Sequence, residues 1–355
     1  MDKDRYIRQT SLSGFGTRSQ ERLGASRVLI VGLGGLGIPA AQYLNAMGVG
    51  TIGLAEQDRI ELHNLQRQVL YTESDLGRPK LEVAAEFLKG QNSTSSLILH
   101  DTYLNRHNAL EIMATYDVIL DATDNFPTRY LINDASVILG KPFVYGALHG
   151  FEGQVSVFNW KGGPTYRCLF PKMPTATEVP DCNVNGVLGV LPGIVGNLQA
   201  LETIKLLTGI GQPLSGQLLI YDGLEQTIRK MRFSRHPERS VVRELLDNYE
   251  GVGCGTAENM LMEDFTQLLQ RNPGIQVLDV RTIKEYKLDH ISGAINIPLN
   301  ELPSRLAELN RNAALYIVCA TGIRSKKAQN WLIGQGWESP VLNIAGGMQR
   351  FRETC

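Results

Sequence analysis

The sequence predicts an α/β fold in which a Rossmann-like nucleotide-binding domain with a mixed sheet precedes a small second α/β domain. Three observations carry this prediction. Short apolar runs alternate with helical segments, a glycine turn follows the first apolar run, and a second alternating segment begins after the composition changes near residue 234. Such alternation favours a parallel sheet covered by helices. A chain of 355 residues has room for about two or three domains.

The expected strands and helices of the first domain follow one another in order. Strands are expected at residues 28–31, 51–55, 97–100, 118–121 and 143–145, with helices between them at 38–47, 80–89, 109–115 and 128–139. Residues 154–159, 217–221 and 227–233 look like antiparallel additions, which makes the expected sheet mixed. The apolar stretch 190–207 reads as a long helix, either in the core or on a dimer face.

Composition divides the chain into a first domain at 1–233, a linker at 234–258 and a second domain at 259–355. The linker is charged and contains proline at its start, and it is rich in glycine near its end. In the second domain we expect strands at 276–280 and 315–318 and a helix at 325–334.

Charge and cysteine usage exclude several classes of protein. Lys and Arg number 35 against 36 Asp and Glu, so no net field favours nucleic acid. The start of the chain is charged and lacks an apolar signal segment, and the uncharged stretch 28–55 is too rich in glycine to predict a membrane span. The five cysteines are odd in number and widely spaced, which indicates a reducing cytoplasm rather than a disulfide framework.

A set of charged and polar residues follows the glycine turn and distinguishes this domain from a redox Rossmann domain. The turn contains Gly32, Gly34, Gly35 and Gly37 and predicts a phosphate site at a helix N-terminus. The residues that follow it are Glu56, Asp58, Asn64, Arg67, Gln68, Lys80 and Asp124. Each charge alone could be a solvated surface group. Together the cations and acids suggest a triphosphate held with a metal ion, and hence cleavage of the nucleotide.

Residues 5 to 233 resemble the ThiF/MoeB family, the bacterial relatives of ubiquitin-activating enzymes. The matching stretches are RYIRQ at 5–9, VLIVGLGGLG at 28–37, NLQRQ at 64–68, GRPK at 77–80, DATDN at 121–125, EGQVSVF at 152–158, YRCLFP at 166–171 and GVLGVLPGIVG at 186–196. The resemblance implies ATP-dependent adenylation of the C-terminal glycine of a ubiquitin-like sulfur-carrier protein that ends in Gly-Gly. It leaves open whether that carrier serves molybdopterin, thiamine, cysteine or thiolated tRNA synthesis.

The same resemblance implies a role for each polar residue. Arg67 and Lys80 would contact the phosphates, and Asp124 would handle Mg²⁺. Glu56 would bind the ribose at a position where most relatives have Asp. Asp58 matches the second acid of the family's DxD motif. Asn64 and Gln68 belong to the nucleotide-binding set. Arg8 matches an arginine that reaches the phosphates from the other subunit, so a homodimer is expected.

Two features near the end of the first domain concern cysteine. Relatives usually hold a structural zinc with two CxxC pairs, but Thr165, Arg239 and Val242 occupy three of the four ligand positions and only Cys168 remains. We therefore expect no structural zinc. Cys182 matches a cysteine on a loop above the adenylate, which either takes the carrier covalently or is an inert thiol.

Residues about 262–352 resemble a rhodanese domain through LDVRTIKEY at 278–286, HISGAINIPL at 290–299, CATGIRS at 319–325 and AGGMQRF at 345–351. Cys319 follows an expected strand and precedes a helix, where loop amides stabilise an anionic sulfur, and Arg324 adds a cation. Four residues separate Cys319 from Arg324, as in sulfurtransferases, whereas related phosphatase loops have five. Asp289 stands where relatives usually have Gly, and we attach little weight to it.

The preferred function is therefore adenylation of a sulfur carrier followed by sulfur transfer from a Cys319 persulfide, which yields a thiocarboxylate. One alternative keeps adenylation but ends in conjugation of a ubiquitin-like modifier through a Cys182 thioester. An NAD-dependent oxidoreductase would use the glycine turn but leaves NLQRQ and Lys80 unexplained. A nucleotide-sensing scaffold without catalysis would not need Arg67, Lys80 and Asp124 together.

Overall fold

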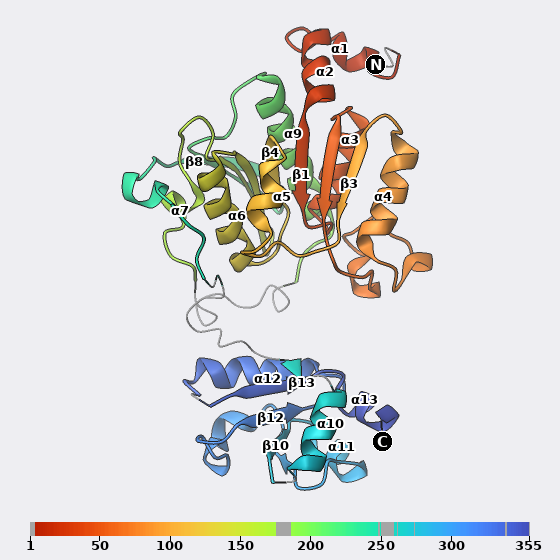
Figure 1. Cartoon of the computed structure of the whole chain (residues 1–355), viewed down its shortest axis with the longest axis vertical. Helices are drawn as coiled ribbons and strands as arrows, with labels where there is room; N and C mark the ends of the chain where they lie inside the picture. The colour runs from red at the N-terminus through yellow and green to blue at the C-terminus, as the bar shows by residue number, and fades with distance from the viewer. Residues whose placement is uncertain are drawn as a thin grey trace. The chain divides into compact units, whose positions relative to one another are not determined.

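The computed structural model describes residues 4–174, 186–247, 249, 259–260, 262–272, 274–337 and 339–354. The chain divides into two compact units (Figure 1). The first unit comprises Met1–Met173 and Asp181–Tyr249, and the second comprises Pro174–Pro180 and Glu250–Cys355.

The first unit is built on one eight-stranded sheet with the order β3-β2-β1-β4-β5-β6-β7-β8. The strands are β1 (Arg27–Val31), β2 (Thr51–Ala55), β3 (Ser96–His100), β4 (Val118–Asp121), β5 (Phe143–His149), β6 (Glu152–Phe158), β7 (Gln217–Asp222) and β8 (Thr227–Arg232). Strands β3, β2, β1, β4 and β5 run parallel, and the three later strands pair in antiparallel fashion. The mixed α/β sheet expected from the sequence is confirmed.

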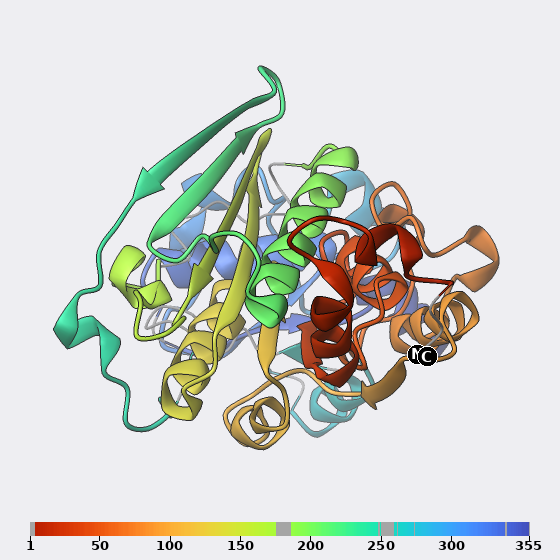
Figure 2. The same cartoon turned by 90° about the horizontal axis from the view of Figure 1, so that it is seen from above.

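Helices cover both faces of this sheet. Helices α2 (Gly16–Ala25), α3 (Gly37–Ala46), α4 (Lys80–Gln91) and α9 (Val190–Thr208) contribute to one buried cluster, and α5 (Ala109–Ala114), α6 (Phe126–Leu139) and α7 (Tyr166–Leu169) contribute to the other. Figure 2 shows α2 and α9 on the opposite side of the sheet from α6. Most residues of α9 are buried against the sheet, so this apolar helix belongs to the core.

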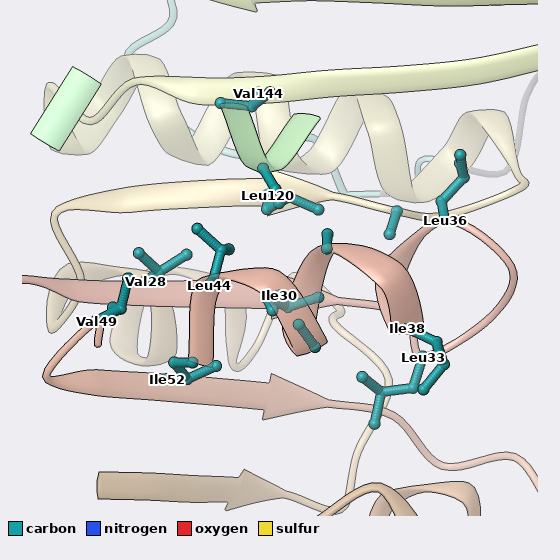
Figure 3. Packing of buried hydrophobic residues seen from close by; sticks show 14 of the residues in the cluster. Val28, Ile30, Leu33, Leu36, Ile38, Leu44, Val49, Ile52, Leu120 and Val144 are labelled. Carbon is teal, nitrogen blue, oxygen red and sulfur yellow. The ribbon is translucent and has the colours of Figure 1, made fainter. Parts of the chain in front are cut away.

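Alternation along β1 explains why both faces are apolar. Val28 and Ile30 point into the cluster beneath α3 and α9, whereas Leu29 and Val31 belong to the cluster on the other face. Figure 3 shows side chains of β1 together with Leu120 of β4 and others from α3. Because successive side chains of a strand point to opposite faces, a strand covered on both sides must be apolar throughout.

The second unit contains a parallel five-stranded sheet with the order β11-β10-β12-β13-β9. Its strands are β9 (Asn259–Met260), β10 (Gln276–Asp279), β11 (Ile295–Asn296), β12 (Leu315–Val318) and β13 (Val341–Ile344). Helix α12 (Ile323–Gly334) packs into one cluster through Ala328 and Leu332. Helices α10 (Met262–Arg271) and α13 (Gly347–Thr354) pack into another, while α11 (Ile283–Leu288) precedes β11.

The described part of the expected linker is held on the first unit. Ser240, in the short helix η3 (Pro237–Ser240), is buried, and the Tyr249 hydroxyl donates to Asp134 Oδ2 at 2.9 Å. Residues 248 and 250–258 of the expected linker lie outside the described residues. Within the part of the chain that the structure describes, no helix combines the length and apolar character that crossing a membrane requires.

Candidate functional site

The glycine turn between β1 and α3 leaves no room for side chains at two of its positions. Gly32 has φ +93°, and a Cβ there would lie 2.9 Å from the Ala122 carbonyl oxygen. A Cβ on Gly37 would lie 1.9 Å from the Gly32 carbonyl oxygen. Because β1, β2 and β4 end in register at Val31, Ala55 and Asp121, the residues that follow them meet at one edge of the sheet. This edge is the predicted nucleotide site.

Glu56 holds the turn through its carboxylate. Its Oε2 accepts from the Leu33 backbone N–H at 2.9 Å, and its Oε1 accepts from the N–H groups of Gln57 and Asp58 at 2.8 and 2.9 Å. The residue is only 7% exposed. Glu56 thus lies directly after β2 and holds the glycine turn, and its expected role at the ribose stays a prediction.

The NLQRQ segment lies against the same turn. A Cβ on Gly35 would lie 3.4 Å from Arg67 Cγ, and one on Gly34 would lie 3.6 Å from Gln68 Nε2. Among the described atoms, the buried Gln68 Oε1 has no hydrogen-bond partner, which leaves an acceptor for a ligand beside the glycines. Asn64 is buried and its side-chain oxygen accepts from the Glu61 N–H at 3.1 Å, so it stabilises the turn at the start of this segment.

Lys80 begins α4 and is 4% exposed. Its Nζ lies 2.9 Å from Asp58 Oδ2, and the exposed Tyr103 hydroxyl donates to the other oxygen of Asp58. Burial raises the pKa of Asp58, but the hydrogen bonds from Tyr103 and Lys80 outweigh this and hold it below its usual range. Asp58 is thus held in its charged form at the Lys80 ammonium, directly after β2.

Asp124 is exposed in the loop that follows β4. The loop is organised by fully buried Asp121, which accepts from the Thr123 N–H at 3.0 Å and from its hydroxyl at 2.6 Å. Arg129 of α6 donates to the Thr123 carbonyl at 2.7 Å, and its Nε lies 3.8 Å from Asp121 Oδ2. These contacts present Asp124 at the same sheet edge as the turn.

Arg8 is not brought to this site within one chain. It is exposed on α1 (Ile7–Thr10), and Tyr6 anchors that helix where α3 and α4 end: Asn92 Nδ2 donates to the Tyr6 hydroxyl at 3.1 Å. Gln9 donates to the carbonyl of Met47, the residue that follows α3, at 3.0 Å. The glycine turn lies at the opposite end of α3, which is about 15 Å long.

Hydrogen bonds join the two segments where zinc ligands were missing. Cys168 Sγ accepts from the His236 N–H at 3.2 Å and lies 3.2 Å from Ser240 Oγ and 3.4 Å from Thr165 Oγ1. Burial opposes ionisation of the Cys168 thiol, yet these hydrogen bonds lower its pKa. Thr165 Oγ1 also donates to the Arg239 carbonyl at 3.3 Å. Cys182 lies outside the described residues.

The second unit places Cys319 at the end of β12, before α12. Its Sγ accepts from the Gly322 N–H at 3.1 Å and from the Ser325 hydroxyl at 3.2 Å. Gly322 has φ +94°, a conformation that favours glycine. The loop is backed closely by the start of α13, since a Cβ on Gly347 would lie 2.3 Å from the Cys319 carbonyl oxygen. The thiol loop therefore offers donors to a sulfur anion.

Arg324 points its guanidinium at a carboxylate. It donates to the two oxygens of Glu285 at 2.9 and 2.6 Å, while Glu285 also accepts from the Thr282 N–H and hydroxyl. The Arg324 hydrogen bonds hold the pKa of Glu285 at about 2. The expectation that Arg324 adds a cation to the loop stays a prediction, because its positive charge is shared with Glu285.

A cavity of about 270 Å³ opens beside the thiol loop. Its lining includes Ala320 and Thr321, which follow Cys319, and the charged residues Arg281, Glu285, Asp289 and Arg352. Buried Arg281 donates to Asp289 Oδ1 at 3.0 Å, and Arg352 donates to Asp289 Oδ2 at 2.7 Å. Asp289, to which the sequence analysis attaches little weight, carries one of the charges that line this cavity.

Sequence reasoning missed three polar residues of these sites: Tyr103, Glu285 and Gln199. A Thr-x-x-Glu capping signal at 282–285 could have identified Glu285 as a helix cap, but not as the partner of Arg324. Buried Gln199 of α9 donates to the Asp121 carbonyl at 2.6 Å, a contact across distant segments that no local pattern indicates.

Comparison with known proteins agrees with this geometry. The ThiF family model matches residues 6–241, and the model of the rhodanese-like domain matches residues 261–354. The adenylyltransferase and sulfurtransferase MOCS3 of Arabidopsis thaliana is 38% identical over 97% of this chain and 82% of its own length. The probable adenylyltransferase/sulfurtransferase MoeZ of Mycobacterium tuberculosis is 37% identical over 97% of this chain and 91% of its own.

Two further similarities concern the first unit. The sulfur carrier protein adenylyltransferase of Thermus thermophilus is 51% identical over 71% of this chain and 96% of its own length. Among solved structures, a complex of Escherichia coli MccB with an MccA derivative matches with a TM-score of 0.60 at 22% identity, covering 69% of this chain and 75% of that one. At this identity the likeness concerns the fold alone.

Proposed function

The chain belongs to the ThiF family and carries a C-terminal rhodanese-like domain, and from this membership we propose that it adenylates a small ubiquitin-like sulfur-carrier protein and then thiolates it. It is an enzyme of the adenylyltransferase and sulfurtransferase class. We assign adenylation to residues 1–233 and sulfur transfer to residues 259–355, joined by the segment 234–258. The carrier would end in Gly-Gly, and its terminal carboxylate would be the group activated.

The observation that carries the proposal is the convergence of the glycine turn, Arg67 and the Lys80–Asp58 pair at one sheet edge. The Lys80 Nζ to Asp58 Oδ2 distance is 2.9 Å, and Arg67 packs against Gly35 of the turn. A dinucleotide used for hydride transfer has no need of two cations there. A triphosphate does, because charge moves onto pyrophosphate as the bond breaks.

ATP is the nucleotide of ThiF-family adenylyltransferases, and the adenylation step follows from its chemistry. A carboxylate oxygen of the carrier attacks the α-phosphorus, the bond from that phosphorus to the bridging oxygen breaks, and the electron pair leaves with pyrophosphate. Arg67 and Lys80 would neutralise the phosphates, and the amides of the glycine turn would bind them. No general base is needed, because the attacking carboxylate is already ionised.

Asp124 is the residue we propose for Mg²⁺. Magnesium is usually held by one or two carboxylates together with substrate phosphates, and the exposed Asp124 carboxylate at the sheet edge suits that donor set. The ion would supply charge neutralisation for the departing pyrophosphate. Asp121, Thr123 and Arg129 would fix the loop so that the Asp124 carboxylate faces the nucleotide.

Glu56, Asn64 and Gln68 would orient the rest of the nucleotide. The Glu56 carboxylate already accepts three backbone hydrogen bonds, and its remaining acceptor capacity suits ribose hydroxyls. Gln68 Oε1, buried and without a partner among the described atoms, suits a donor group of the ligand. Asn64 would act by holding the NLQRQ segment in place.

A homodimer would complete the site. Arg8 is exposed at the end of α3 opposite the glycine turn, which supports the view that its guanidinium serves the partner's nucleotide rather than its own. We therefore propose composite sites, each with Arg8 from one protomer and Arg67 and Lys80 from the other.

Sulfur transfer would use Cys319. Its thiolate attacks the outer sulfur of a donor, the sulfur–sulfur bond of the donor breaks, and Cys319 becomes a persulfide. The terminal sulfur of that persulfide then attacks the carrier's acyl-adenylate, and AMP leaves. Reduction of the resulting acyl-disulfide, by a second thiol or an external reductant, releases the thiocarboxylate. The Gly322 amide and the Ser325 hydroxyl would stabilise the sulfur anion.

Pyrophosphate exchange tests the adenylation half. With a candidate carrier ending in Gly-Gly present, the chain should exchange labelled pyrophosphate into ATP, and without the carrier it should not. Lys80→Ala should lower the exchange rate at least a hundredfold, because it removes a preorganised cation. Lys89→Ala, on the exposed end of the same helix, is the matched control and should keep the rate. Tight NAD binding without exchange would refute the proposal.

Cysteine variants test the sulfur half. Cys319→Ala should keep exchange but abolish the carrier thiocarboxylate, measured by mass spectrometry. Cys182→Ala separates the remaining routes. Loss of thiocarboxylate with exchange intact indicates a covalent intermediate at Cys182, whereas an unchanged yield identifies it as a bystander. A carrier conjugated to other proteins through Cys182, with Cys319 dispensable, would replace this function by modifier conjugation.

A further inference from the structure

The cavity beside the thiol loop has as many carboxylates as cations in its lining. Arg281 and Arg352 contribute positive charge, and Glu285 and Asp289 contribute negative charge. Ala320 and Thr321, the residues directly after Cys319, line the same cavity, so these charges lie beside the loop that holds the thiol.

Each arginine in and next to this cavity already donates hydrogen bonds to a carboxylate. Arg281 donates to Asp279 Oδ2 at 2.8 Å and to Asp289 Oδ1 at 3.0 Å, and it is 1% exposed. Arg352, on α13, donates through Nε to Asp289 Oδ2 at 2.7 Å. Arg324 is held by both oxygens of Glu285. Asp289 is thus the carboxylate of this lining that accepts from both of its arginines, Arg281 and Arg352.

The backbone does not dictate an acid at this position. Asp289 has φ −159° and ψ 149°, extended values that ordinary residues adopt, and it caps the end of α11. Family resemblance leads to the expectation of Gly here. Its side chain is 31% exposed, and hydrogen bonds from Arg352 and Arg281 hold its pKa at about 2, so it is ionised at neutral pH.

The charge of the cavity matters because sulfur donors differ in the charge of the group that leaves when they give up their outer sulfur. From thiosulfate, the thiolate takes the outer sulfur and the electron pair of the broken sulfur–sulfur bond leaves with sulfite, a dianion. From an alkyl persulfide, the same attack expels a thiolate with one negative charge. Cations in the cavity would favour the first donor far more than the second.

We propose that Asp289 is a specificity-determining residue that neutralises the cavity and so selects persulfides of thiols over small dianionic sulfur donors. The inference rests on the proposed role of Cys319 as sulfur acceptor. With Asp289 in place, the four charged lining residues sum to zero. Replacing it by a neutral residue leaves the lining with one net positive charge. Arg352 and one N–H group of Arg281 then lose their carboxylate acceptor and can donate to a bound anion.

The test compares two donors on the full chain: thiosulfate and N-acetylcysteamine persulfide, whose thiol part is uncharged. The rate of sulfur loading onto Cys319 is followed by intact mass and peptide mapping. Asp289→Asn should raise kcat/KM for thiosulfate on the order of tenfold and leave the persulfide within about threefold. Asp264→Asn, an exposed acid of α10 that does not line the cavity, is the control for equal loss of charge.

Arg352→Gln gives an independent reading, because it removes an exposed cation and leaves Asp289 ionised. It should lower the rate of sulfur loading from thiosulfate below that of the wild type, without changing the rate from the persulfide. The proposal is overturned if Asp289→Asn matches Asp264→Asn on thiosulfate, or if both donors rise equally. A wild-type chain that takes no sulfur on Cys319 from either donor would instead contradict the proposed function itself.

Discussion

Glu285 illustrates how one carboxylate links two segments of the second unit. It caps the start of α11 through Thr282 and pairs with Arg324 of α12 by two hydrogen bonds. The Arg324 bonds are the main reason why its pKa falls from 4.5 to about 2. Both side chains are about a third exposed, so solvent screens the pair and its contribution is about 1 kcal/mol.

This pair predicts an acid-sensitive second unit. Because the folded pKa of Glu285 lies below its usual value, its stabilisation is complete above about pH 4.5 and is lost as pH falls toward 2. Glu285→Gln should flatten that part of the pH profile and lower the free energy of unfolding at pH 7 by about 1 kcal/mol. Urea unfolding followed by tryptophan fluorescence reports on it, since Trp331 and Trp337 lie in this unit. Identical profiles for the variant and the wild type would contradict the assignment.

At the residue scale, the sequence motifs identified residues whose position is set by the neighbouring strand or turn. Glu56 and Cys319 each follow a strand at a fixed place, so their surroundings could be anticipated. The partner of Arg324 could not, because Glu285 lies on a different helix and its approach depends on tertiary packing. The same reason explains why Asp289 received little weight.

At the scale of elements, α9 and the glycine turn approach each other unusually closely. A Cβ on Gly196 would lie 2.3 Å from the Leu36 carbonyl oxygen and 2.7 Å from Pro39 Cγ, whereas one on Gly193 would meet nothing within 4 Å. Two glycines of one helix therefore differ in what an added methyl group does.

Gly196→Ala should destabilise the first unit by about 1–3 kcal/mol, since the helix must shift away from Leu36. It should also weaken ATP binding, because Leu36 belongs to the turn. Gly193→Ala should stabilise by about 0.5–1 kcal/mol through helix propensity. Chemical unfolding and calorimetric titration of ATP measure both effects. Equal behaviour of the two variants would show that α9 does not brace the turn.

The segments η3 and α7 give a second prediction at this scale. Cys168 is joined to His236 and Ser240 by hydrogen bonds, and it is the one cysteine among the four positions where the family resemblance implies zinc ligands. Elemental analysis of the purified chain should find less than about 0.1 zinc per chain, and prolonged treatment with a chelator should leave the unfolding midpoint unchanged. About one tightly bound zinc per chain would contradict this expectation.

Strong periodicity made most strands and helices of the first unit predictable. Thr51–Ala55 and Val118–Asp121 coincide with their expected ranges because both are short buried runs next to a charged residue, Glu56 after the first and Asp117 before the second. Helices α1 and α2 were not anticipated. The four residues of α1 are too few for a periodic signal, and α2 carries a polar exposed face with Leu23 as its buried apolar anchor.

At the scale of the whole molecule, a shared site predicts complementation between inactive chains. Arg8→Ala and Lys80→Ala each remove one component of every site in a homodimer. Mixed dimers contain one site that lacks both residues and one intact site. Mixing the two variants under conditions of subunit exchange should therefore restore up to about a quarter of the wild-type pyrophosphate-exchange activity, since half of the dimers are mixed and each has one working site.

Arg18→Ala is the control for this experiment. It removes another exposed basic side chain near the start of the chain, and the variant should be active alone. No recovery after demonstrated exchange would indicate that Arg8 serves its own chain.

The order of elements along the chain has a consequence for synthesis on the ribosome. The glycine turn emerges early, but the residues that pack against it or against the neighbouring strand β4, Pro192, Gly196 and Gln199, all belong to α9. Until α9 has emerged, the face of the sheet that it covers remains open, and the carbonyl of Asp121 lacks its donor. Long-range contacts of this kind form late. A nascent chain that ends before α9 would therefore display the glycine turn and still be unable to retain ATP, so nucleotide binding marks the arrival of α9, before β7 and β8 complete the sheet.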